Sequence, residues 1–215
     1  MFGKKKEMTG NSKIKLNNIE TLNFKQIKDY DFVVGIKIKN KTLSSINYIS
    51  KKLDKKYKIN YLFNNSVGPH ITLTNTFKLK KKIDIKKIFF ELEKIKKKNF
   101  LMKFKNLSIF FGDTPAHVLR WQHNQEIIAL KNSVEDILMK TKKQNLIPKF
   151  ERNIEFIAKT TVAYKDTNID NLEKISKLLR NSKLPKICEV DNICLYGCRP
   201  YIDEIELFQI KLKKY

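Results

Sequence analysis

A histidine and a threonine that stand two residues apart could act together on a phosphate. The stretch VGPHITLTNTF, residues 67 to 77, holds His70 and Thr72 in an alternating apolar run. Residues two apart on a β-strand point to the same face, so the imidazole and the hydroxyl would reach one spot while Ile71 and Leu73 enter the core. A hydroxyl can donate to a phosphate oxygen, and an imidazole can transfer a proton. The pair predicts phosphate chemistry; an ordinary histidine on a surface strand is the alternative.

A similar pair stands in the second half of the chain. The stretch NIEFIAKTTVAY, residues 153 to 164, has the same alternation and puts Lys159 and Thr161 on one face. A polar pair flanked by apolar residues thus recurs in each half. This repetition favours a functional reading of His70, because one histidine beside a threonine is weak evidence by itself.

The two stretches resemble the motifs of the two-histidine (2H) phosphoesterases, which include the 2′,5′ RNA ligase-like proteins and cyclic phosphodiesterases. That family is marked by two His-x-Ser/Thr motifs. The first motif matches from Pro69 to Thr72, including the proline. In the second motif the family has proline and histidine where this chain has Ala158 and Lys159. The resemblance covers about residues 31 to 213 of this sequence.

The resemblance implies an α+β fold with two pseudo-symmetric lobes. Each lobe would be a small, mostly antiparallel sheet backed by helices, and the active groove between the lobes would hold His70, Thr72, Lys159 and Thr161. It also implies a reaction without metal or cofactor, in which one imidazole acts as base, the other as acid, and both hydroxyls grip the phosphate. The implied ligands are a nucleotide, an oligonucleotide or an RNA 3′ end.

The lysine in the second motif divides the expected function in two. Histidine titrates near 6.5 and serves as acid or base at neutral pH, whereas a lysine near 10.4 stays protonated and is a poor base. One hypothesis is a phosphodiesterase for a 2′,3′-cyclic phosphate, a 2′,5′-linked oligonucleotide or a cyclic nucleotide, with His70 as base and Lys159 as acid or phosphate clamp. The other is an impaired relative that binds and sequesters a nucleotide or RNA end without cleavage.

The charge balance admits a third interpretation. The chain has 45 basic and 22 acidic residues, a net charge of +23, which attracts anionic partners. A lysine-rich structural or RNA-coating protein would have this composition. Arginine is the usual residue for sequence-specific nucleic-acid contacts, and only Arg120, Arg152, Arg180 and Arg199 occur. The lysines therefore favour a solvated surface over a dedicated polynucleotide track.

Four further residues are candidates for substrate binding. Arg199 and Tyr201 follow a Gly-Cys turn in a region from which members of the family place side chains near the substrate; a surface arginine beside a tyrosine that packs in the core is the alternative. An unpaired base could stack on Trp121, although a single tryptophan is more often part of the core. Arg152 could reach a phosphate or a surface carboxylate. In addition, His123 could replace the missing second imidazole if its strand borders the groove.

The hydrophobic pattern predicts alternating strands and helices. Strands are expected at 31–40, 67–77, 101–111, 116–122 and 154–164, and a hairpin or pair of strands, broken at Gly197 and Pro200, at 186–212. Helices are expected at 41–57, 83–98 and 124–140, with Asn124 as N-cap, and around 172–179.

Residues 1 to 30 are polar and rich in lysine, so we expect a partly disordered extension followed by one domain from 31 to 215. The N-terminal segment lacks the apolar stretch of a signal peptide, and no run approaches the roughly 18 apolar residues of a membrane span. The three cysteines indicate a reducing compartment without a disulfide framework. We expect a cytoplasmic monomer that does not bind membranes.

Overall fold

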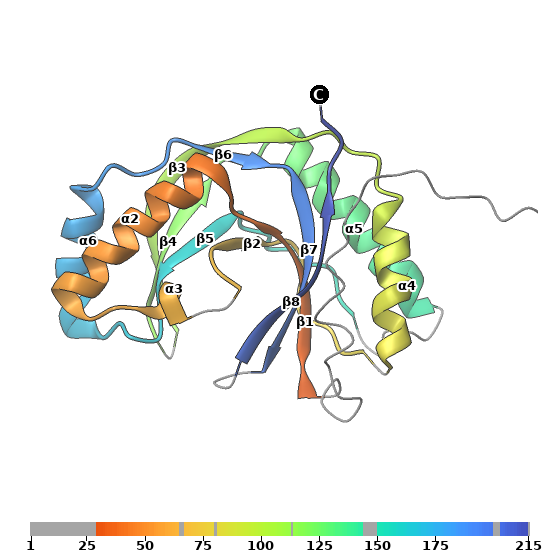
Figure 1. Cartoon of the computed structure of the whole chain (residues 1–215), viewed down its shortest axis with the longest axis horizontal. Helices are drawn as coiled ribbons and strands as arrows, with labels where there is room; N and C mark the ends of the chain where they lie inside the picture. The colour runs from red at the N-terminus through yellow and green to blue at the C-terminus, as the bar shows by residue number, and fades with distance from the viewer. Residues whose placement is uncertain are drawn as a thin grey trace, which may run out of the picture.

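The computed structural model describes residues 29–64, 67–79, 81–112, 114–143, 150–199 and 203–214. All but the last two residues of the expected N-terminal extension, and the candidate Tyr201, lie outside these ranges. The described chain is an α+β fold with two antiparallel sheets, as expected (Figure 1). None of the described helices has both the length and the hydropathy to cross a bilayer.

The first sheet has the strand order β2-β1-β7-β8. Its strands are β1 (Asp31–Lys37), β2 (His70–Thr72), β7 (Asn192–Arg199) and β8 (Asp203–Lys211). All of its pairings are antiparallel. The strand that carries the first motif, β2, is short and lies at an edge of this sheet, next to β1.

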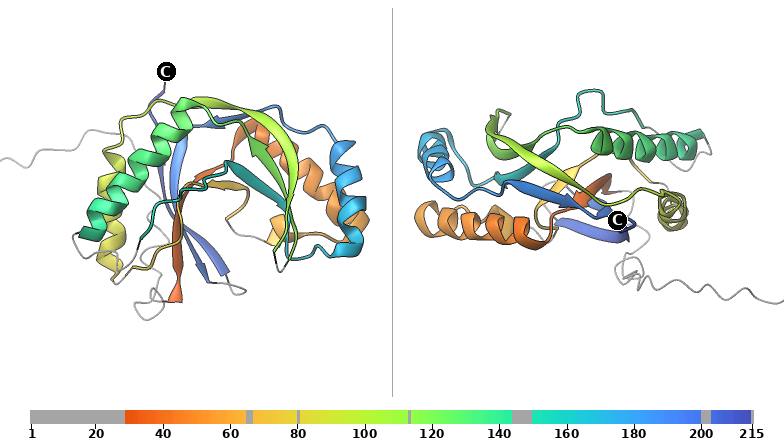
Figure 2. Two further views of the ribbon diagram at one scale, coloured as in Figure 1. Left: turned by 180° about the vertical axis from the view of Figure 1, so that it is seen from behind. Right: turned by 90° about the horizontal axis from the view of Figure 1, so that it is seen from above.

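The second sheet has the order β5-β4-β3-β6. It consists of β3 (Phe100–Phe110), β4 (Ala116–Trp121), β5 (Lys159–Ala163) and β6 (Ile187–Val190), again antiparallel. The strand of the second motif, β5, is likewise an edge strand. Figures 1 and 2 show β2 and β5 next to each other in the middle of the molecule, where the two sheets meet.

Two pairs of helices cover the ends of this arrangement. At one end lie α2 (Asn40–Tyr57) and α6 (Leu172–Arg180), and at the other α4 (Lys82–Glu93) and α5 (Gln125–Lys143) (Figure 2). A single turn, α3 (Tyr61–Asn64), follows α2, and a 3-10 turn (Ile169–Asn171) precedes α6. The N-cap expected at Asn124 is confirmed, because its Oδ1 accepts a hydrogen bond from the backbone of Ile127 at 2.9 Å.

The helices do not simply stay with the sheet that precedes them. Helix α2 follows β1 of the first sheet but packs against β5 and β6 of the second sheet and against α6. Helix α5 follows β4 of the second sheet but packs against α4, which lies on β8 of the first. The amphipathic patterns allow this exchange, since each apolar stripe, such as Ile46, Ile49 and Leu53 of α2, is fully buried there.

Several expected boundaries were wrong. The strand expected at 67–77 is only His70–Thr72, and the helix expected at 83–98 ends at Glu93. The closing segment forms three strands, β6 to β8, rather than a pair, and the break expected at Pro200 lies outside the described residues.

The strand expected from 154 begins only at Lys159. The carbonyl oxygen of Ala158 still accepts a hydrogen bond from the backbone of Trp121 at 2.9 Å, but the Ala158 N–H donates to the side chain of His123 instead of to a strand. Gly197 does not break its strand, since β7 continues to Arg199. A Cβ at Gly197 would lie 3.0 Å from the Tyr30 ring, so the glycine allows an aromatic side chain to pack on the strand.

Candidate functional site

A cavity of about 850 Å³ lies where the edge strands of the two sheets meet. His70 and Thr72 line it from β2, and Lys159 lines it from β5. We call this cavity the central groove. Its other lining residues are Val33, Tyr61, Val67, Thr74, Asn75, Thr76, Phe110, Asn153, Glu155, Ile157, Tyr164, Tyr196, Gly197, Cys198 and Glu204. The two motifs thus reach one cavity from different sheets.

The ring of His70 is held by its backbone neighbour and by an aromatic ring. Nδ1 lies 3.0 Å from the carbonyl oxygen of Gly68. A carbonyl only accepts, so Nδ1 carries the hydrogen and Nε2 is left with its lone pair. The His70 ring also packs 5.0 Å from the Tyr196 ring. Burial lowers the pKa of His70 below 6.5, opposed in part by the Gly68 hydrogen bond and the Glu204 carboxylate, so the imidazole is neutral at neutral pH.

Lys159 lies over an aromatic ring on the β5 side of the groove. Its Nζ lies 4.1 Å from the centroid of Phe110, at the end of β3. A ring face attracts a cation and helps to fix the position of the ammonium group. Burial lowers the pKa of Lys159 from its usual value of 10.5. The side chain is thus a cation that gives up its proton more readily than a solvated lysine.

The two threonines of the motifs differ in their surroundings. Thr72 is half-buried and lines the central groove. Thr161 is also half-buried, and alternation puts it on the same face of β5 as Lys159. It is nevertheless not one of the described residues that line the central groove. Thr160, next to both Lys159 and Thr161 in β5, is buried and accepts a hydrogen bond from the indole of Trp121 at 3.0 Å.

Several lining residues were not found from the sequence. Glu204 of β8 is close enough for its charge to raise the pKa of His70. Tyr61 and Tyr164 form an edge-to-face pair with centroids 5.5 Å apart. Tyr196 is buried, and burial raises its pKa well above 10.0, so it contributes a ring rather than a proton. No local pattern in the sequence marks these residues, because each comes from a different segment of the chain.

The structure does not bring Trp121 or Arg152 to the central groove. Trp121 is 1% exposed and packs edge-on against Phe104, so no base could stack on it. The guanidinium of Arg152 pairs with Asp136 and lies 3.8 Å from Glu135, both on α5. Burial contradicts the substrate-binding prediction for Trp121. Arg152 makes the contact with a surface carboxylate, that of Asp136, that was its alternative, although Asn153 beside it does line the groove.

The remaining candidates lie elsewhere or outside the described chain. Arg199 stacks on the Tyr30 ring, with its Cζ 4.9 Å from the centroid, and is not among the described groove-lining residues. Tyr201 is outside the described residues. His123 is exposed, stacks on Phe156 and accepts the Ala158 N–H, so its ring supports the start of β5 rather than replacing an imidazole in the groove.

No group of three or more histidine, cysteine or acidic side chains suited to a metal ion occurs among the residues that the structure describes. The central groove does offer the imidazole, the ammonium group and hydroxyls, and it also holds the carboxylates of Glu155 and Glu204. An uncharged base, a cation and hydrogen-bond donors around one cavity suit an anionic ligand that undergoes proton transfer.

Solved structures of other proteins share the fold of this chain. No family model matches the sequence, and no curated protein does. Among solved structures, LigT of E. coli in complex with 3′-AMP aligns with a TM-score of 0.56 and 13% identity over 85% of this chain and 98% of LigT. The protein TT0787 of Thermus thermophilus aligns with a TM-score of 0.56 and 10% identity over 86% and 98% of the two chains. A protein described as a phosphoesterase gives a TM-score of 0.54, 11% identity and coverage of 86% and 99%.

Proposed function

We propose that this chain, which has the fold of LigT and so of the two-histidine phosphoesterases, is a metal-independent phosphodiesterase with one histidine and one lysine at its centre. A single observation carries the proposal: His70 and Lys159 line the same cavity from neighbouring edge strands of the two sheets. The reaction class is hydrolysis of a phosphodiester by paired acid and base groups.

A nucleotide or oligonucleotide is the proposed substrate class. The LigT structures with this fold are described as complexes with 3′-AMP, NADP+ and ATP. The central groove combines the cation of Lys159 with the rings of Phe110, Tyr61 and Tyr164, which suit a phosphate and a base. We propose a 2′,3′-cyclic phosphate, a 2′,5′-linked oligonucleotide or a cyclic nucleotide as the scissile compound.

His70 is the proposed general base. Its Nδ1 is committed to the Gly68 carbonyl, and its Nε2 has a lone pair that can accept a proton from water. Because burial keeps the ring neutral at neutral pH, most molecules are ready for this step. The resulting hydroxide attacks phosphorus and the imidazole becomes an imidazolium.

Lys159 is the proposed acid and phosphate clamp. Its ammonium group stabilises the charge that develops on the phosphate oxygens and gives a proton to the departing ribose oxygen as the P–O bond breaks. Solvent then takes the proton from the imidazolium of His70 and returns one to the amine of Lys159, a downhill exchange because the amine is the stronger base. Thr72 would donate to a phosphate oxygen, and Thr161 is the proposed second donor because alternation puts it on the same face of β5 as Lys159.

A second candidate function is sequestration without cleavage. Lys159 favours it, because an acid that remains protonated holds a phosphate well but yields its proton less readily than an imidazolium. Burial reduces this difference by lowering the pKa of Lys159. The two functions share the ligand and differ only in the proton transfer.

The test is a panel of 2′,3′-cyclic, 3′,5′-cyclic and 2′,5′-linked nucleotides, incubated with the protein while binding and products are followed. We expect product from at least one compound in the presence of EDTA, and loss of about 10²- to 10⁴-fold in rate for His70→Ala. Retention of intact ligand in stoichiometric amount would establish the sequestering function instead. Binding that does not depend on His70 or Thr72 and falls steeply with salt would support the RNA-coating interpretation.

A further inference from the structure

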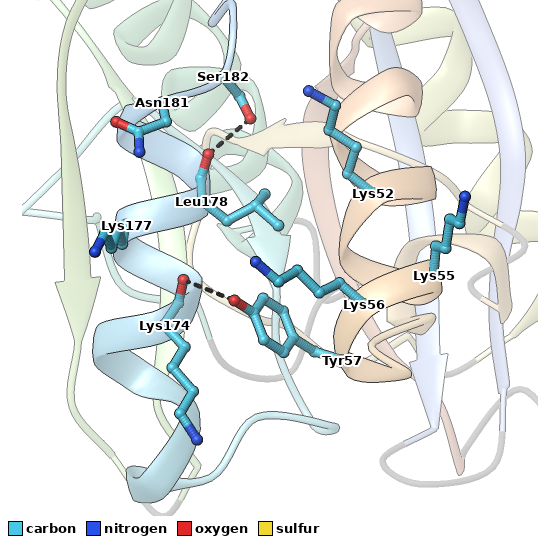
Figure 3. Close-up of a pocket in the computed structure, with 9 residues that line it drawn as sticks. All are labelled: Lys52, Lys55, Lys56, Tyr57, Lys174, Lys177, Leu178, Asn181 and Ser182. Carbon is cyan, nitrogen blue, oxygen red and sulfur yellow. Dashed lines mark hydrogen bonds between the residues drawn. The ribbon is translucent and has the colours of Figure 1, made fainter.

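A second hollow of about 810 Å³ lies between α2 and α6, away from the two motif strands. It is lined by Lys52, Lys55, Lys56 and Tyr57 of α2 and by Lys174, Lys177, Leu178, Asn181 and Ser182 on or just after α6 (Figure 3). We call it the α2/α6 groove. Among its described lining residues five are lysines and none is acidic.

The five lysines are not neutralised by the protein. None of them makes an ion pair with a carboxylate in the part of the chain that is described, and four of the five are exposed. Elsewhere the chain does pair its lysines, as Lys37 pairs with Glu206 at 2.7 Å and Lys131 with Glu135 at 2.8 Å. Figure 3 shows Lys56 extending between the helices, whereas the side-chain nitrogens of Lys55 and Lys177 lie on the outer sides of α2 and α6. Like charges gathered on two neighbouring helices repel one another, so an anion bound there lowers the energy of the folded protein.

The floor of the α2/α6 groove is apolar and held in place. Figure 3 shows the Tyr57 ring and the Leu178 side chain between the two helices. The Tyr57 hydroxyl donates to the carbonyl oxygen of Lys174 at 3.3 Å, which ties the helices together. Lys56 extends into the same space, with its Nζ 5.4 Å from the Tyr57 centroid. An aromatic floor with cations around it is the arrangement that binds single-stranded nucleic acid.

The α2/α6 groove and the central groove share one short connection. Tyr57 lines the first and Tyr61, at the start of α3, lines the second. Four residues span at most about 14 Å, so the two cavities are neighbours along this segment. Lys165 lies there too, with its Nζ 5.7 Å from the Tyr61 centroid.

From these contacts we infer that the α2/α6 groove binds the phosphate backbone of a single-stranded oligonucleotide, a strand that extends from the central groove past Tyr61 and Tyr57. This rests on the proposed function, because the strand end in the central groove is its phosphodiester ligand. A membrane surface fits less well, since the lysines, Tyr57 and Leu178 line a hollow between two helices rather than a flat face. An acidic peptide has the right charge but no use for a floor on which bases stack.

The experiment compares two triple variants with the same loss of charge. Lys56→Ala/Lys174→Ala/Lys177→Ala removes lysines of the α2/α6 groove, and Lys86→Ala/Lys87→Ala/Lys103→Ala removes three exposed lysines that do not line it. Fluorescence anisotropy measures the dissociation constants of a 12-nucleotide single-stranded RNA and of a dinucleotide that reaches only the central groove. A polyglutamate peptide and vesicles with anionic lipid serve as competitors.

We expect the groove variant to bind the long RNA about tenfold more weakly, since an exposed ion pair contributes roughly a factor of 1.4 to 5. The slope of log affinity against log salt should fall by about 2, as each lost phosphate contact on a single strand removes about 0.7. The control variant should show less than half of the loss in binding free energy and less than half of the change in slope. The wild-type protein and both variants should bind the dinucleotide equally well.

Equal weakening by both variants, or by neither, would overturn the inference, because the net charge rather than the α2/α6 groove would then explain binding. Polyglutamate or anionic vesicles would overturn the inference as well if they displaced the RNA from the wild-type protein and the control variant, but not from the groove variant, and bound the first two proteins more tightly than the RNA does. Failure of the proposed function would be seen separately. A wild-type protein that neither binds nor cleaves the dinucleotide would contradict the proposed central site. The affinities of the two triple variants for the 12-nucleotide RNA would then still test whether the α2/α6 groove binds RNA.

Discussion

The ammonium nitrogen of Lys159 lies 4.1 Å from the centroid of the Phe110 ring, and both residues line the central groove. The ring helps to fix where the charge is, and burial reduces how tightly the proton is held. Because His70 on the other sheet is held neutral, the groove has one group ready to accept a proton and one ready to give it.

Lys159→Met, which keeps the length of the side chain but not its charge, should reduce turnover about 10²- to 10⁴-fold, because the acid and the phosphate cation are both lost. Lys159→His should restore part of this, since an imidazolium is a better acid at neutral pH. Single-turnover rates on the nucleotide cleaved fastest are the measurement, with Lys103→Met, at an exposed position of β3, as control. Unchanged turnover in Lys159→Met would remove Lys159 from the mechanism.

The pH dependence of kcat/KM should be broad. Activity requires neutral His70, whose pKa lies below 6.5, and protonated Lys159, whose pKa lies below 10.5. Activity should therefore rise with pH through the lowered histidine pKa, stay level across neutral pH and fall through the lysine pKa. In Lys159→His the alkaline limb should move toward neutrality, which leaves a narrower bell. A wild-type profile that already falls at pH 7 would contradict the assignment.

Glu204→Gln should move only the acid limb of that profile. The Glu204 carboxylate raises the pKa of His70, so its removal should lower that pKa and carry the acid limb to lower pH, with little change in the plateau. Glu206→Gln is the matched control, because Glu206 on the same strand pairs with Lys37. An acid limb that stays in place in Glu204→Gln would show that another group titrates there.

Gly35→Ala should damage both stability and activity. Gly35 of β1 is opposite Thr72, and a Cβ on it would lie 2.7 Å from the carbonyl oxygen of Ile71 and 3.0 Å from the Tyr196 ring. Backbone must shift to admit the methyl group, so we expect a loss of about 1–3 kcal/mol in the free energy of unfolding and a displaced His70. Urea unfolding and turnover are the measurements. Gly112→Ala, with no atom within 4 Å of the new Cβ, should change neither.

Three of the four polar residues of the motifs could be placed in the central groove from the sequence, because strand alternation is a local property; Thr161 is not among the described lining residues. His70 and Thr72 share a face of β2 and both line the central groove, and Lys159 lines it from β5. The fold class followed from the resemblance and is confirmed by the two antiparallel sheets and by the match to LigT. The catalytic roles of these residues stay predictions.

Alternation says which residues share a face, but not what covers that face, and Trp121 shows the difference. It lies on a strand with a second strand on either side, and its ring is enclosed by contacts that include Phe104 and Thr160. Glu204 and Tyr61 show the converse, since they reach the central groove from segments outside both motifs. Their positions depend on which strands and helices pack together, and a single sequence does not state this.

Helices α2 and α5 each pack away from the sheet whose strand precedes them, and this limits how the chain could be cut into fragments that fold. Each end is built from elements of both halves of the chain, so a fragment that stops between β3 and β4 would leave α2 without the strands on which it packs. The two lobes should therefore not behave as independent folding units, and a hinge between them would have to carry several chain crossings at once. The whole fold therefore sets the distance between His70 and Lys159. A ligand must fit the central groove as it is, because the two lobes cannot easily move together around it.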